Sequence, residues 1–212
     1  MTLVSIPDFI TKYAARGFDH PRLPAIISQN GLHMVNMDWG LIPAWVNTQE
    51  EALQISHKTL NARVETLDQK VSFKDNYYEH RCILPASGFF ETQHLNGKKY
   101  PHYVSLKKGI FLFAGIYATW QNKQSFAILT QAANDFMAHI HNHKKRQPIM
   151  LNPQQAQDWL MGNTAHQDLP NIPSSHLQAH MVGPYIHAKT NYDQAKTIEP
   201  YIYPELSQQH LF

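Results

Sequence analysis

The chain has 212 residues, 43% of them hydrophobic and 16% charged, with a net charge of +2. This length suits one domain, and we expect a single domain over residues 1–212. The small net charge excludes a strong overall attraction to nucleic acid or membrane, so any anion site must arise from local clustering. The single cysteine, Cys82, excludes an internal disulfide and a cysteine-rich zinc site, and we interpret it as buried and structural.

The sequence carries no signal for export or membrane insertion. No apolar run approaches the length of a membrane span, and none follows a basic segment as in a signal peptide. We therefore expect a reduced cytoplasmic protein without a membrane partner. Among the basic clusters, residues 144–146 are the candidate anion site, whereas the Lys-Lys pairs at 98–99 and 107–108 are typical of solvated turns.

The first elements are a helix and a hairpin. Residues 5–17 have a proline in the first turn and the apolar spacing of a short helix that ends at a glycine. The dipeptide Asn30-Gly31 supplies the positive φ angles of a tight turn. It predicts a hairpin whose strands are 23–28 and 32–37.

Later elements continue this strand-rich pattern. Thr48 followed by Glu51 predicts a capping box that opens a helix through about residue 56. Asn134 and Asn152 are each placed to cap a further short helix. Strands are predicted at 81–92, 100–106, 110–120, 125–130 and 177–182. We therefore expect an α+β fold with a mostly antiparallel, barrel-like sheet flanked by short helices.

The segment NARVET (61–66) gathers polar side chains between apolar ones. On an extended strand Asn61, Arg63 and Glu65 would point to one face, which is the ordinary pattern of a half-buried strand. The same arrangement would line a binding site with an amide, a guanidinium that binds phosphate and a carboxylate. Both interpretations remain open from the residues alone.

Two further segments carry groups suited to proton transfer. Glu91 follows two phenylalanines in GFFET, and an acid beside aromatics can be desolvated so that its pKa rises. A solvated carboxylate at a strand edge is the commoner alternative. His139, His141 and His143 alternate in HIHNHKKR, which suggests a metal site. We favour one acid–base histidine beside a basic cluster, because the preceding helix separates the three and no carboxylate set accompanies them.

Two tryptophans, Trp39 and Trp45, lie in the segment DWGLIPAW (38–45). They are core residues or flat surfaces for stacking bases, and alone the segment favours the core.

In combination and in this order, WGLIPAW, LNARVET, RCILPASGFFE and IH followed by KKRQPIML resemble the SOS-response-associated peptidase family, whose members crosslink themselves to abasic sites in single-stranded DNA. The resemblance runs from about residue 18 to the YIYPEL segment near the end.

The resemblance implies roles for particular residues. Asn61 would orient the opened sugar, Glu91 would help to open the deoxyribose ring, and His141 would assist the proton transfers. The DNA contacts would come from Trp39, Gly40, Pro43, Trp45, Arg63 and Arg146. Glu65 has no implied role, and we expect it to pair with an arginine. The resemblance implies a monomer that acts at the nucleoid on single-stranded DNA with abasic sites and needs neither a metal nor another cofactor.

The start of the sequence departs from the family pattern. The family's nucleophile is the α-amine of a cysteine at position two, bared by self-removal of the initiator methionine, whereas this chain has Thr2. The family also has a leading strand before the segment that matches GFDHPRLPAII (17–27). We favour a native start upstream of Met1, and the alternatives are a relative that binds DNA without crosslinking or a Schiff base formed by Thr2 alone. From another class of protein, a hydrolase that uses a metal held by the histidines remains an alternative.

Overall fold

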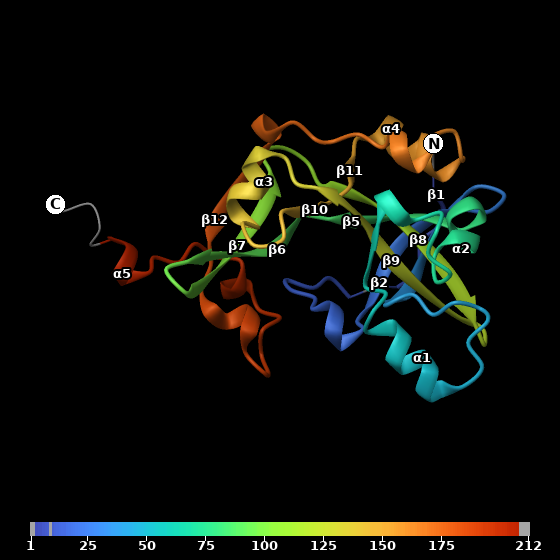
Figure 1. Ribbon diagram of the computed structural model, residues 1–212, viewed down its shortest axis with the longest axis horizontal. Helices are drawn as coiled ribbons and strands as arrows, with labels where there is room; N and C mark the ends of the chain where they lie inside the picture. Colours follow the sequence, from blue (N-terminus) through green and yellow to red (C-terminus); the bar gives the residue numbers. More distant parts are fainter. Residues whose placement is uncertain (1–2, 9, 208–212) are drawn as a thin grey trace.

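The computed structural model describes residues 3–8 and 10–207, and Figure 1 shows their arrangement. The strands are β1 (Leu3–Ser5), β2 (Arg22–Ser28), β3 (Leu32–Trp39), β4 (Asn61–Arg63), β5 (Arg81–Ala86), β6 (Gly88–Leu95), β7 (Lys98–Leu106), β8 (Phe111–Trp120), β9 (Lys123–Ala132), β10 (Arg146–Pro148), β11 (Met150–Leu151) and β12 (Leu177–Met181). The helices are α1 (Gln49–Ser56), α2 (Lys74–Glu79), α3 (Asp135–Ile140), α4 (Pro153–Leu160) and α5 (Pro204–Ser207).

The larger sheet closes on itself. Strands β3, β2, β5, β8 and β9 follow one another as antiparallel neighbours. A short parallel pairing of Asp38 with Ser125 and Trp39 with Phe126 then joins β3 to β9. The sheet is therefore ring-like rather than a formal barrel, which confirms the predicted α+β class. Outside this ring, β4 pairs with β9 in parallel and β10 pairs with β9 in antiparallel fashion.

A second sheet of three strands lies beside the ring, in the order β12-β7-β6. The single strand predicted at 81–92 is wrong, because the chain bends at the exposed Ser87 and passes from β5 in the ring to β6 in this second sheet. Gly88 lets β6 pack closely on β7 directly after the bend, since a Cβ there would come within 2.3 Å of the Tyr103 ring on β7. This bend turns β6 away from the ring, and β6 forms one wall of the site described below.

Local signals in the sequence were mostly accurate. Asn30 and Gly31 have φ angles of 52° and 131° and close the β2–β3 hairpin as predicted. The capping box of α1 forms between Thr48 and Glu51. Asn134 accepts a hydrogen bond from the Met137 backbone N–H and caps α3 as expected.

The helix predicted over 5–17 is wrong in every described part of that range. Ser5 ends β1, residues 6–8 and 10–16 are irregular, and a 3-10 turn follows at Gly17–Asp19. The Asp193 carboxylate accepts hydrogen bonds from the backbone N–H groups of Tyr13 and Ala14, at 2.6 and 3.0 Å. A partner remote in sequence thus satisfies donors that a helix would have used.

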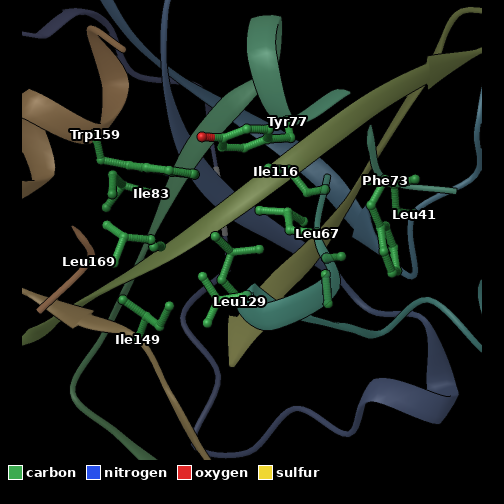
Figure 2. Packing of buried hydrophobic residues seen from close by; sticks show 14 of the residues in the cluster. Leu41, Leu67, Phe73, Tyr77, Ile83, Ile116, Leu129, Ile149, Trp159 and Leu169 are labelled. Carbon is green, nitrogen blue, oxygen red and sulfur yellow. The ribbon is translucent and has the colours of Figure 1, made fainter. Parts of the chain in front are cut away.

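The core fills the ring and the space between it and the helices. Figure 2 shows the side chains of one buried cluster, in which Trp159 from α4 and Tyr77 from α2 pack over Ile83 and Ile116 of the ring. Cys82 is fully buried in the other large cluster, and burial raises the pKa of its thiol, as expected for a structural cysteine. Among the described residues, no helix is long and apolar enough to cross a membrane.

Candidate functional site

A cleft of about 710 Å³ opens where the ring meets the second sheet. Strand β4 contributes Asn61 and Arg63, β6 contributes Glu91, the turn after α3 contributes His141, and β10 contributes Arg146. These five residues are far apart in the sequence, and the structure brings all of them to one cleft. They are the residues to which the sequence assigned the sugar, the proton transfers and two phosphate contacts.

Glu91 and His141 are in direct contact on the cleft wall. The Nδ1 atom of His141 lies 3.2 Å from Oε2 of Glu91, and both side chains are about four-fifths buried, with exposed fractions of 19% and 22%. Burial raises the pKa of Glu91 to about 7, although the Thr92 backbone N–H and the charge of Lys144 act in the opposite direction. A carboxyl with this pKa is partly protonated near neutral pH, which is the requirement for a general acid.

The backbone determines which nitrogen of His141 carries a proton. Nδ1 lies 2.8 Å from the carbonyl oxygen of Arg146, which can only accept a hydrogen bond. Nδ1 is therefore the donor, and the neutral ring keeps the lone pair of Nε2 free to accept a proton. Nδ1 of His141 thus faces Glu91 and the Arg146 carbonyl, and Nε2 is the basic atom of this ring.

Arg146 is anchored by Glu65, which confirms the expectation that Glu65 pairs with an arginine. Nη1 and Nη2 of Arg146 donate to the two carboxylate oxygens at 2.5 and 2.9 Å, and Nη2 also donates to the Thr130 carbonyl at 2.7 Å. Arg146 thereby lowers the pKa of the Glu65 carboxyl. Nε of Arg146 is buried and has no hydrogen-bond partner among the described residues.

The pattern predicted for 61, 63 and 65 is only partly correct. Asn61 and Arg63 lie on β4, but the strand ends there and Val64–Thr66 form a 3-10 turn that carries Glu65 toward Arg146. The Asn61 and Arg63 side chains are exposed, and neither makes a hydrogen bond or ion pair within residues 3–8 and 10–207. Both are therefore available to a ligand in the cleft.

A second hollow of about 570 Å³ adjoins the cleft, and Asn61 and Arg63 line both. Trp45 lies in this second hollow and is 49% exposed. Lys58 and Lys70 add positive charge to it. The two hollows share a wall, so a long ligand could pass from one to the other across β4.

The structure separates the other residues of the tryptophan segment from both hollows. Trp39 packs its ring on Phe126 and donates its indole N–H to the Leu60 carbonyl, the residue before Asn61. Gly40 and Pro43 are buried. These three residues line neither hollow. The hydrogen bond from Trp39 fixes Leu60, the residue that directly precedes β4.

Two of the three alternating histidines, His141 and His143, line the cleft. His141 contacts Glu91, whereas His143 stacks on His94 with ring centroids 5.3 Å apart, and His139 is exposed outside the cleft lining. Within the described parts of the chain, no group of three or more His, Cys, Asp or Glu side chains is placed to hold a metal ion.

Some cleft residues were not identified from the sequence. Lys99, which we assigned to a solvated turn, lines the cleft from β7. Phe18 lines it from the 3-10 turn Gly17–Asp19, and His187 lines it from the 3-10 turn Pro184–His187. Phe18 lies in the segment GFDHPRLPAII (17–27), but nothing in the sequence around either residue indicated a place in the cleft, so only the tertiary structure could place them. Among the residues that line the cleft, Arg63, Lys99 and Lys144 carry positive charge beside the carboxylate of Glu91, whereas the charge of Arg146 is balanced by Glu65 outside the lining.

Comparisons with known proteins agree with this geometry. A family model described as SOS response associated peptidase (SRAP) matches residues 14–188. The abasic site processing protein YoqW of Bacillus subtilis is 30% identical over 203 residues, which cover 86% of this chain and 88% of that protein. The abasic site processing protein HMCES of Xenopus tropicalis is 25% identical over 184 residues, 73% of this chain and 54% of that protein. A crystal structure of a Bacteroides thetaiotaomicron protein superposes with a TM-score of 0.83 at 30% identity, covering 90% of this chain and 86% of that one.

Proposed function

Because the chain belongs to the SOS response associated peptidase (SRAP) family, we propose that it processes abasic sites in single-stranded DNA by forming a Schiff base with the sugar aldehyde. The observation that carries the proposal is the Glu91–His141 contact in a cleft rich in positive charge. Two relatives named as abasic site processing proteins support the same substrate.

The proposed binding mode uses both hollows. Arg63 lines both hollows and makes no side-chain hydrogen bond or ion pair with any residue that the structure describes, so it would bind a phosphate of the strand. Trp45 would stack a base in the second hollow. Asn61 would bind the oxygen of the opened sugar. The hydrogen bond from Trp39 to Leu60 would fix the start of the strand that carries Asn61.

Glu91 and His141 would supply the proton transfers of the proposed reaction. An amine attacks the C1′ aldehyde and loses a proton to Nε2 of His141, while protonated Glu91 donates its proton to the aldehyde oxygen, which gives a neutral carbinolamine. The imidazolium of His141 then returns its proton to the carbinolamine hydroxyl, which leaves as water when the nitrogen lone pair forms the C=N bond, so the product is a protonated Schiff base beside the Glu91 carboxylate. General acid–base assistance of this kind typically contributes about 100-fold or more to the rate. Thr2, at the position of the family's nucleophile, lies outside the described residues, so the amine has to be identified by experiment.

The test is reductive trapping. Borohydride reduces a Schiff base to a stable amine, so protein incubated with a single strand containing an abasic site should give a covalent adduct, and peptide mapping of the adduct identifies the amine. We expect Glu91→Gln to slow trapping about 100-fold. The matched control is Glu199→Gln, which changes an exposed carboxylate that lines neither hollow. Equal trapping by all three proteins would contradict the assigned role of Glu91.

Non-covalent binding of the same strand is the second candidate, and the excess of positive charge in the cleft favours it without requiring a nucleophile. Arg63→Ala should weaken binding and lower the slope of log affinity against log salt by about 0.7, the value for one phosphate contact on a single strand. Arg22→Ala, which changes an exposed arginine outside both hollows, is the control. Salt-dependent binding without any trapped adduct would establish this second candidate and withdraw the Schiff base.

A further inference from the structure

Phe18 is an aromatic residue on the wall of the charged cleft, and no role has been assigned to it so far. It lies in the 3-10 turn Gly17–Asp19, lines the same cleft as Glu91 and His141, and is 71% exposed. Single exposed aromatic residues are common on protein surfaces, so exposure alone indicates nothing. The inference depends on the position of Phe18 in the cleft and on the contacts that hold its backbone.

A network of contacts fixes the turn that presents Phe18. Nε of Arg16 donates to the Asp19 carboxylate at 2.8 Å, and Nη1 of Arg16 donates to the Ala188 carbonyl at 2.7 Å. Tyr192 donates its hydroxyl to the same carboxylate at 2.5 Å, and its ring lies 3.8 Å from the Arg16 guanidinium. The turn is thus bound to a segment near the other end of the chain, which limits the conformational freedom that binding would otherwise remove.

The surroundings of Phe18 favour an anionic ligand with flat groups. Arg63, Lys99 and Lys144 line the cleft with it. Positive charge along a groove combined with an exposed aromatic ring is the arrangement that binds single-stranded nucleic acid, because the charges follow the backbone and the ring stacks a base. An apolar protein partner would gain little from a single ring in a cleft that is otherwise lined by basic side chains.

We propose that Phe18 stacks the unpaired base next to the abasic sugar, on the side opposite the base at Trp45. This inference rests on the proposed function and adds a specific contact to it. Phe18 and Trp45 lie in different hollows, and Asn61 and Arg63 line both of those hollows. The abasic sugar at Asn61 would then have an aromatic platform for each neighbouring base, which keeps the strand open around the reacting carbon.

The test removes the ring and the base separately. Binding is measured by fluorescence anisotropy with three single strands that carry a central tetrahydrofuran, a stable abasic analogue without an aldehyde. The first strand has both neighbouring bases, the second lacks the 5′ neighbour and the third lacks the 3′ neighbour. We expect Phe18→Ala to weaken binding of the first strand about fivefold or more, the low end for loss of one stacked base. The loss should disappear with one of the other two strands and persist with the other.

Three controls separate the possible explanations. Tyr78→Ala removes another exposed aromatic, outside both hollows, and should bind all three strands like the wild type. Tyr192→Ala keeps Phe18 but removes two contacts of its turn, and its smaller loss should follow the same strand dependence. Phe18→Trp should retain the affinity. An equal loss with all three strands, or none with the first, would overturn the inference, whereas failure of the wild type to bind any strand would overturn the proposed function itself.

Discussion

Replacement of Glu91 by glutamine should stabilise the protein while it removes the proposed acid. The Glu91 side chain is only 22% exposed, and burial raises the pKa of its carboxyl from 4.5 to about 7. The folded protein therefore holds this proton more tightly than the unfolded chain does. Ionisation of the buried Glu91 carboxyl at higher pH therefore lowers the free energy of unfolding. Groups that serve a function often reduce stability in this way.

The magnitude and the sign follow from linkage. Between about pH 4.5 and pH 7 the folded state binds more protons at this group than the unfolded state, so the free energy of unfolding falls as the pH rises. At about 1.4 kcal/mol for each pH unit between the two pKa values, the upper limit is about 3 kcal/mol above pH 7. Glu91→Gln has no charge to bury, so its advantage over the wild type should be small near pH 4 and about 2–3 kcal/mol near pH 8.

Urea denaturation of both proteins at about pH 4 and pH 8 tests this directly. Titrating groups that do not contact Glu91 are present in both proteins, so their shared pH dependence cancels in the difference, whereas His141, 3.2 Å from Glu91, is coupled to it and contributes to the difference as part of the pair. Glu199→Gln, at an exposed position, should show no such change between the two pH values. An advantage of Glu91→Gln that is the same at both pH values would refute the raised pKa and with it the role of Glu91 as an acid near neutral pH.

Two further substitutions and one labelling experiment test the packing of the fold. Glu65→Ala should lower the free energy of unfolding by about 1 kcal/mol, because Arg146 loses its bidentate partner; urea titration should show this loss shrinking as the pH falls below 4.5, the ordinary pKa of a Glu carboxyl, because Arg146 lowers that pKa in the folded protein. Gly40→Ala should cost about 2 kcal/mol or more in the same assay, since φ is +120° and the new Cβ would lie 2.6 Å from Nδ1 of His20; a neutral result would contradict the tight packing. Cys82 should react with a thiol reagent only after unfolding, and rapid labelling of the folded protein would contradict its complete burial.

Local chemistry in the sequence was sufficient for the turns, the helix caps and the strand-rich class. The Asn30-Gly31 turn and the Thr48–Glu51 box depend on neighbours a few residues away, so the sequence predicts them directly. The helix expected at 5–17 failed because the donors of Tyr13 and Ala14 bind Asp193, far along the chain. The spacing of apolar residues in a segment cannot indicate a hydrogen-bond partner that lies so far away in the sequence.

The same distinction applies to the site. The motifs of the sequence identified the chemical groups, namely the amide of Asn61, the acid of Glu91 and the imidazole of His141. Only the tertiary structure decided that the ring closes between β3 and β9, that Glu91 is buried against His141, and that Phe18 lines the same cleft. A pKa depends on the solvent and the charges around a group, and a cleft depends on which segments meet in space. The sequence therefore determined which groups are available, and the fold determined their environment.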